Sequence, residues 1–244
     1  MRHLSKYLIM SAVCLGLFAV RAQARDLRGS LPLLPPLVES KDKGILVDLL
    51  RAMAKEYKGG KITWDVYPFA RSMENVEQGR ADFHMPQLVN PHIDPSKLPF
   101  QLSSEKIFRV IFALYTNKDN KHINPGNASK FKIETDLGVR NFFDFPVAGS
   151  ADIASSLKKV DMGRIDGWLF AMPESDMVLK RLGLKHIKRW QYKKFDVRVV
   201  LAKGEKGKEV DRILTGLIRK LQANGQYQQI MAPILDEKFV NWQM

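Results

Sequence analysis

The sequence predicts an α/β protein built from two similar lobes. The first observation is a repeated tetrapeptide: Gly79-Arg80-Ala81-Asp82 returns as Gly163-Arg164-Ile165-Asp166, each copy lying between an amphipathic stretch and an apolar run. A glycine directly after the last apolar residue of a helix is typical of a left-handed C-cap, so each copy predicts a helix, a turn and a strand. The second observation is the length of 244 residues, which is enough for two small cores.

The first part of the chain alternates between predicted helices and strands. An apolar stripe at helical spacing predicts a helix that ends at Gly59-Gly60. Residues 62–67 are rich in β-branched and aromatic side chains and predict a strand. A second helix begins after Pro68 and ends at Gly79, and residues 83–85 predict the next strand. The order β-α-β-α-β indicates a parallel sheet with helices on its faces.

The rest of the chain predicts further elements of both kinds. Residues 110–115 predict a buried strand, and residues 137–139 a short one. Ser150 is the expected N-cap of a helix that ends at Gly163 and leads into a strand. Residues 196–203 alternate between apolar and polar side chains and predict another strand, which a long amphipathic helix follows.

The N-terminus predicts export. Arg2 and Lys6 form a basic region, residues 7–20 are apolar, and Ala22-Gln23-Ala24 is a small-x-small cleavage site. The apolar run is shorter than the about 20 residues that cross a bilayer as a helix, so we expect a signal peptide cleaved after Ala24 and no stable membrane insertion. The expected location is the periplasm. The only cysteine, Cys14, lies inside the signal, so the mature chain has no thiol or disulfide.

Charge and motifs exclude several kinds of function. The formal net charge is +13, but the basic residues are scattered without an aromatic-interleaved stripe, so we expect a solvated surface and no nucleic-acid partner. His84 and His92 do not belong to an H-E-x-x-H motif or a His/Cys cluster, so no metal site or cofactor is expected. The serines lack a G-x-S-x-G elbow, and no catalytic residues are predicted.

Several motifs together resemble one protein family. Pro35-Pro36 followed by Lys43-Gly44 and an I-L-V-D-L-L run is similar to the opening of type 2 periplasmic substrate-binding proteins, amino-acid-type branch (bacterial solute-binding protein family 3). Tyr67-Pro68-Phe69-Ala70-Arg71 and the G-R-x-D repeats fit this resemblance, as does Asn224-Gly225-Gln226-Tyr227 in a closing helix pair. The family implies two α/β lobes joined by two hinge segments, with the ligand cleft between them.

The resemblance also implies the domain limits. The signal peptide would be residues 1–24, and the first lobe would be discontinuous, combining residues 25–115 with residues 197–244. The second lobe would comprise residues 116–196. The arginine that many amino-acid binders of the family place after the third strand has no match in residues 87–95, so an α-amino acid is a doubtful ligand.

Candidate ligand-binding residues follow from sheet geometry, because ligands of open parallel sheets bind beyond the carboxyl ends of the strands. Arg71 offers a planar fork to an anion, although an ion pair with Glu74 is the alternative. The Ser150 helix start could hold an anion or act as a plain cap, and Asp152 or Glu174 could meet a ligand cation. The predicted set is Arg71, Tyr67, Phe69, Gln87, Ser150, Asp152, Phe170 and Glu174.

The predicted function is binding rather than catalysis. We expect a monomer that captures a small polar solute, such as an amino acid or a related organic acid or amine, for an ABC-type importer (membrane permease) or a membrane sensor. One alternative is a periplasmic dehydratase-like enzyme on the same fold, with Glu174 or Asp152 as general acid. Another is an interaction protein whose ligand site has decayed, which the missing arginine favours.

Overall fold

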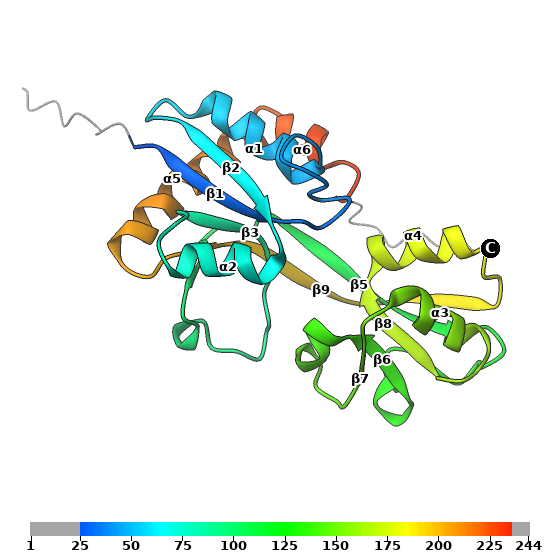
Figure 1. Cartoon of the computed structure of the whole chain (residues 1–244). Coiled ribbons are helices and arrows are strands. Elements are labelled where there is room, and N and C mark those ends of the chain that lie inside the picture. The colour runs from blue at the N-terminus through cyan, green and yellow to red at the C-terminus, as the bar shows by residue number, and fades with distance from the viewer. Residues whose placement is uncertain (1–24, 236–244) are drawn as a thin grey trace, which may run out of the picture.

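The computed structural model describes residues 25–235 (Figure 1), so the predicted signal peptide lies outside the described residues. One part of the molecule carries three parallel strands with helices on both faces of the sheet. We call it the first lobe. Its strands are β1 (Leu27–Pro32), β2 (Ile62–Tyr67) and β3 (Phe83–Leu88), and its helices are α1 (Ile45–Glu56), α2 (Phe69–Glu77), α5 (Glu205–Ala223) and α6 (Gln226–Met231).

The other part, the second lobe, repeats this plan on a smaller scale. Its three short strands are also mutually parallel. They are β6 (Ile133–Asp136), β7 (Ala148–Ser150) and β8 (Gly167–Ala171), with helices α3 (Ile153–Asp161) and α4 (Met172–Leu182) and the 3-10 segment η3 (Leu137–Phe142). Two further 3-10 segments are η1 (Pro95–Lys97) and η2 (Ala128–Lys130).

Two long strands, β5 (Phe108–Asn117) and β9 (Ile187–Leu201), run from one lobe into the other (Figure 1). They pair antiparallel, β9 also pairs with β3 and the short β4 (Gln101–Leu102), and β5 pairs with β8. The strand order β2-β1-β3-β9-β5-β8-β6-β7 therefore forms one continuous mixed sheet. Both expected lobe boundaries, at residues 115/116 and 196/197, fall inside these two strands.

The strand directions make the carboxyl ends of the strands in one lobe face the carboxyl ends of the strands in the other. β5 leads from the first lobe into the second, so β8, which is antiparallel to β5, points back toward the first lobe together with β6 and β7. β9 returns to the first lobe, so β3, which is antiparallel to β9, points toward the second lobe together with β1 and β2. This is the fold class that the sequence predicts.

The larger apolar cluster runs through the first lobe and continues into the second, where it includes Ile133 and Leu169, and a smaller cluster lies within the second lobe. In the first lobe, Leu46 and Leu50 of α1 pack in one cluster with Leu31, Phe83 and the apolar stripe of α5. In the second lobe, Leu157 of α3 and Leu179 of α4 cover Tyr115 and Trp168. No helix within residues 25–235 combines the length and the apolarity needed to cross a membrane.

Three sequence-based element assignments were wrong in detail. Residues 137–139 are not a strand but belong to η3, because the Asp136 side chain accepts from the Gly138 N–H and turns the chain. The strand lies just before, in β6. Helix α3 is capped by Asp152, not by Ser150. The strand predicted at residues 196–203 starts earlier, as part of the 15-residue β9.

Candidate ligand site

The loops after β3 and β6 border a cavity of about 250 Å³ between the lobes, which we call the β3 cavity. Gln87 and Asn90 line it from the first lobe, and Asn141 and Phe142 of the η3 region line it from the second. The Phe142 ring packs on Phe195 of β9 at a centroid distance of 5.8 Å. The β3 cavity therefore lies beside the strand that joins the lobes.

Hydrogen bonds cross between the lobes next to this cavity. The Asn90 side-chain amide donates to the Asn141 carbonyl at 3.3 Å, and His92 Nε2 lies 3.1 Å from the Phe142 carbonyl. His92 Nε2 also lies 3.3 Å from a carboxylate oxygen of Asp144, which Lys193 pairs from β9 at 2.9 Å. The loop after β3 is therefore fastened to the second lobe, and any movement of the lobes must change these contacts.

Behind the strand end lies a buried histidine. The ring of His84 is fully buried, its Nδ1 is 2.7 Å from the Ser72 hydroxyl, and its Nε2 is 3.2 Å from the Pro86 carbonyl. A carbonyl only accepts, so Nε2 carries the proton and Nδ1 accepts from Ser72. Burial lowers the pKa of His84 from 6.5 to about 4, so the ring is neutral near pH 7. It fixes α2 and the Pro86 backbone directly before Gln87.

The predicted aromatic Phe69 lies at the start of α2 and remains 45% exposed. Its ring meets the His84 ring edge-on, with centroids 5.2 Å apart. Phe69 is thus held by the same histidine that contacts the Pro86 carbonyl near the end of β3. It is a large apolar surface at the carboxyl end of β2.

The predicted residues of the second lobe lie at two strand ends. Ser150 ends β7, where its hydroxyl oxygen lies 2.9 Å from the Ser156 hydroxyl oxygen, and Asp152 caps α3 by accepting from the Ser155 N–H at 2.6 Å. The Ser156 hydroxyl donates its one hydrogen to the buried carboxylate of Glu134 at 2.6 Å. Lys159 pairs with the Glu134 carboxylate at 3.0 Å, so the carboxylate that opposes an anion at this helix start is that of Asp152.

Phe170 lies near the end of β8, where its ring packs against Phe112 and Trp168 with centroids 5.5 Å and 5.6 Å apart. It is half-buried, so part of the ring supports the junction between β8 and β5. Its contacts are those of a partly buried core aromatic.

Glu174 lies in the first turn of α4 and lines a second cavity of about 480 Å³, the α4 cavity. Leu37 and Ile45 border this cavity from the first lobe, and Arg109 from β5. One carboxylate oxygen of Glu174, Oε2, is buried and has no hydrogen-bond partner among the described residues. Burial raises the pKa of this carboxyl, with only its own backbone N–H acting in the other direction.

Next to Glu174 the α4 cavity contains a buried ion pair. The Arg189 guanidinium donates to Asp176, and the Tyr115 hydroxyl donates to the other oxygen of Asp176 at 2.8 Å. Burial, followed by the Asp176 charge, raises the pKa of Tyr115 well above 10.0, so it stays a donor. This network fixes α4 to β5 and β9.

Arg71 and Tyr67 lie apart from these cavities. Arg71 pairs with Glu74 at 3.0 Å and is 53% exposed, the ion pair that the sequence offers as its alternative role. Both residues line a hollow of about 230 Å³ on the first lobe, together with Asn75 and Arg80. The predicted set is therefore distributed over several places, with Gln87 in the β3 cavity and Glu174 in the α4 cavity.

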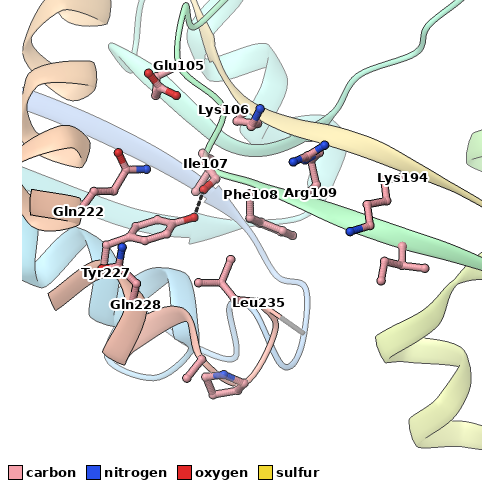
Figure 2. Close-up of a pocket in the computed structure, with 13 residues that line it drawn as sticks. Glu105, Lys106, Ile107, Phe108, Arg109, Lys194, Gln222, Tyr227, Gln228 and Leu235 are labelled. Atoms are coloured by element: carbon pink, nitrogen blue, oxygen red, sulfur yellow. Dashed lines mark hydrogen bonds between the residues drawn. The ribbon is translucent and has the colours of Figure 1, made fainter. Parts of the chain in front are cut away.

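A third cavity, of about 840 Å³, lies where α6 meets the beginning of β5 (Figure 2). Figure 2 shows Lys106, Arg109 and Lys194 along one side and the Tyr227 hydroxyl donating to the Ile107 carbonyl. The Ile107 N–H donates to the Val197 carbonyl at 2.7 Å. α6 and β9 thus anchor the chain at Ile107, directly before β5 leaves the first lobe.

No sequence signal marks Asn90 or Asn141, and His92 was considered only as a metal ligand. These polar residues stand in irregular segments without a motif, and only the meeting of two distant loops brings them together. The role of Ser72 was not predicted. Ser72 is buried on α2, where its hydroxyl contacts His84. Among residues 25–235, no group of three or more His, Cys, Asp or Glu side chains is placed to hold a metal ion.

Comparisons with known proteins agree on the fold. No protein-family model and no curated protein matches the chain. A histidine kinase sensor domain with similarity to periplasmic binding proteins matches with a TM-score of 0.65 and 16% identity, over 88% of this chain and 98% of that chain. The substrate binding protein of an amino acid ABC transporter matches with a TM-score of 0.61 and 16% identity, over 87% and 100%.

A third solved structure is an ancestral amino acid-binding protein described as a precursor of cyclohexadienyl dehydratase. It matches with a TM-score of 0.62 and 17% identity, over 86% of this chain and 95% of that chain. These likenesses, together with the hinge strands and the opposed strand ends, show that the chain has the two-lobe fold of the type 2 periplasmic binding proteins.

Proposed function

We propose that this chain is an exported solute-binding protein that closes its two lobes over a small polar solute and presents it to a membrane partner. The observation that carries the proposal is the opposition of two sets of strand carboxyl ends across a hinge of two strands, β5 and β9. Ligands of open α/β sheets bind at such ends, and closure around a hinge excludes water from the bound solute.

The hinge lies within β5 and β9. The β5–β9 pairing shifts register between Ile111 and Ala113, where β9 has an extra residue, and such a bulge interrupts the ladder and bends the strand. Residues 112–116 of β5 already pair with β8. We therefore propose lobes close to the expected limits of 25–115 plus 197–244 and 116–196, with bending concentrated at residues 108–112.

The solute would be bound by residues at the facing strand ends. Gln87 offers an amide in the β3 cavity, Phe69 an exposed ring, and Ser150 and Asp152 a polar helix start. Arg71 remains a predicted anion contact, but it would have to exchange Glu74 for the ligand. Titration of Arg71→Ala separates these roles: a large loss of affinity supports ligand contact, and affinity within about twofold supports the surface ion pair.

The partner and compartment follow from the same proposal. The N-terminal signal of the sequence supports release into the periplasm, and mass spectrometry of periplasmic material should find a chain that starts at Arg25. We propose that it acts there as a monomer. Both an importer substrate-binding protein and a kinase sensor domain share the fold, so the membrane partner is a permease or a sensor.

A thermal-shift screen of amino acids, organic acids, polyamines, short peptides and uncharged amides tests the function. A ligand at 100 times its dissociation constant adds about 2.7 kcal/mol to the free energy of unfolding. We expect at least one compound class to raise the melting temperature and to bind in calorimetry with one site. Absence of binding by every class would contradict the proposal and favour an interaction protein without a ligand.

One observation favours a second candidate, a dehydratase-like enzyme. Glu174 has a buried carboxylate oxygen without a partner among the described residues, and its raised pKa suits a general acid that protonates a leaving hydroxyl. Incubation with hydroxyl-bearing cyclic carboxylic acids, followed by mass spectrometry, tests it. Loss of water that disappears in Glu174→Gln would support the enzyme, and unchanged substrates would leave binding as the function.

A further inference from the structure

The β3 cavity differs from the rest of the cleft in its chemistry. None of the described residues that line it is an aspartate, glutamate, lysine, arginine or histidine. Its polar side chains are the three amides of Gln87, Asn90 and Asn141. The remaining walls are mainly apolar and include Met73 of α2 and Phe142 of η3.

The amides leave hydrogen-bonding capacity for a ligand. Gln87 donates through Nε2 to the neighbouring Leu88 carbonyl at 2.8 Å, and no described residue donates to its Oε1. The Asn90 side chain donates to the Asn141 carbonyl and accepts from the His92 N–H at 2.9 Å, while the side chain of Asn141 makes no bond to the described residues. The site can therefore both donate to and accept from a neutral polar group.

Exposed apolar side chains also follow strand ends in both lobes. Leu33 directly follows β1 and is 56% exposed, Leu137 directly follows β6 and is 52% exposed, and Ile93 lies in the loop after β3. With Phe69 after β2, four of the six exposed large apolar side chains within residues 25–235 follow strand ends that face the other lobe. On closure of the lobes these side chains would approach one another, and a large contiguous apolar surface is typical of a binding site.

We infer that the solute enters the β3 cavity with an uncharged part that has an apolar body and a hydrogen-bonding group of the amide or hydroxyl kind. This inference rests on the proposed function and names its ligand class. An ionised carboxylate or ammonium in this cavity would lose its hydration without meeting an opposite charge, which is strongly unfavourable. An apolar body that covers exposed apolar side chains such as Ile93 on closure removes apolar surface from water, which favours binding.

Two probes with the same ring and different charge test the inference by calorimetry. N-acetyl-L-phenylalaninamide is neutral and carries two amides, whereas L-phenylalanine is a zwitterion. We expect the neutral probe to bind at least tenfold more tightly. Gln87→Leu should weaken its binding at least tenfold, and Gln226→Leu, at an exposed position on α6, should leave it unchanged.

The outcomes separate the ligand class from the function. Tighter binding of L-phenylalanine, or binding of any charged compound unaffected by Gln87→Leu, would overturn the inference and leave solute binding intact. Absence of binding by either probe and by every compound in the screen would contradict the proposed function as well. Gln87→Asn, which keeps the amide but shortens its reach, is the second variant if Gln87→Leu does not fold.

Discussion

Asp82 and Asp166 make the same pair of hydrogen bonds in the two lobes. The Asp82 N–H donates to the Arg28 carbonyl at 2.7 Å, and its carboxylate accepts from the Arg28 N–H at 2.8 Å. The Asp166 N–H donates to the Lys132 carbonyl at 3.0 Å, and its carboxylate accepts from the Lys132 N–H at 2.8 Å. The repeated tetrapeptide therefore marks one turn used twice to join a helix exit to the start of the neighbouring strand.

The two aspartates should differ in their contribution to stability. Asp82 is buried and also meets Lys206 at 3.1 Å and Arg25 at 3.4 Å, whereas Asp166 is half-buried. Asp82→Ala should lower the free energy of unfolding by about 1–3 kcal/mol, and Asp166→Ala by less. Urea unfolding of both variants at pH 7 measures the difference. Equal losses of unfolding free energy in the two variants would contradict an additional contribution from Lys206 and Arg25.

Acid should weaken the Asp82 contribution. Burial acts to raise the pKa of Asp82, but the Arg28 N–H, Lys206 and Arg25 outweigh it and lower the pKa below 3.8. A lowered pKa in the folded state gives stability that is present above the ordinary value and is lost as the pH falls through the folded value. Between about pH 5 and about pH 3, Asp82→Ala should therefore lose less stability than the unchanged chain.

His84 should make the free energy of unfolding depend on pH in a range closer to neutrality than that of Asp82. Its pKa is lowered from 6.5 to about 4 by burial, so its contribution to stability is complete above 6.5 and declines as the pH falls toward 4. The shift corresponds to about 3 kcal/mol between these limits. His84→Gln, whose amide can still accept from Ser72, should show a flatter stability profile from about pH 7 to about pH 4. A profile as steep as that of the unchanged chain would assign the effect to another group.

Glu174 should act in the opposite direction. Because burial raises its pKa, the stability it contributes is present below the ordinary value of 4.5 and is lost as the pH rises through the folded value. Glu174→Gln removes the charge and should raise the free energy of unfolding at pH 7 by about 1 kcal/mol. Glu77→Gln, at an exposed position of α2, is the matched control. A destabilised Glu174→Gln would indicate a partner for the ionised form.

His92 should influence how far apart the lobes lie without a ligand. Its ring contacts the Phe142 carbonyl and Asp144 across the cleft, so His92→Ala should shift the free protein toward a more open form. Small-angle scattering should show a larger radius of gyration than for His122→Ala, an exposed histidine of the second lobe. Identical radii would mean that the remaining contacts hold the lobes together.

Much of the fold could be predicted because its signals are local. The strand at residues 62–67 and the helix between Pro68 and Gly79 match β2 and α2, since periodicity, proline and glycine act over a few residues. The first half of β9 was not predicted because its many Lys and Arg side chains are typical of an exposed edge strand. Its burial comes from pairing with β5, which lies far away in the sequence. Residues 137–139 look like a strand until Asp136 turns the backbone.

The site was harder to predict than the fold. Sequence reasoning located strand ends, and Gln87 and Glu174 do line interlobe cavities. It offered the Arg71–Glu74 ion pair only as an alternative and could not foresee that Asn90 and Asn141 would meet, because these contacts depend on side-chain direction and on the placement of distant loops. Whether each predicted residue touches the solute stays a prediction for titration.

Small-angle scattering of the chain from Arg25 onward, alone and saturated with the tightest-binding compound of the screen, tests the central claim most directly. Closure of two lobes about β5 and β9 predicts a smaller radius of gyration for the complex, because the facing strand ends approach each other around the solute. An unchanged radius with a tightly bound compound would contradict hinge closure and indicate one rigid body.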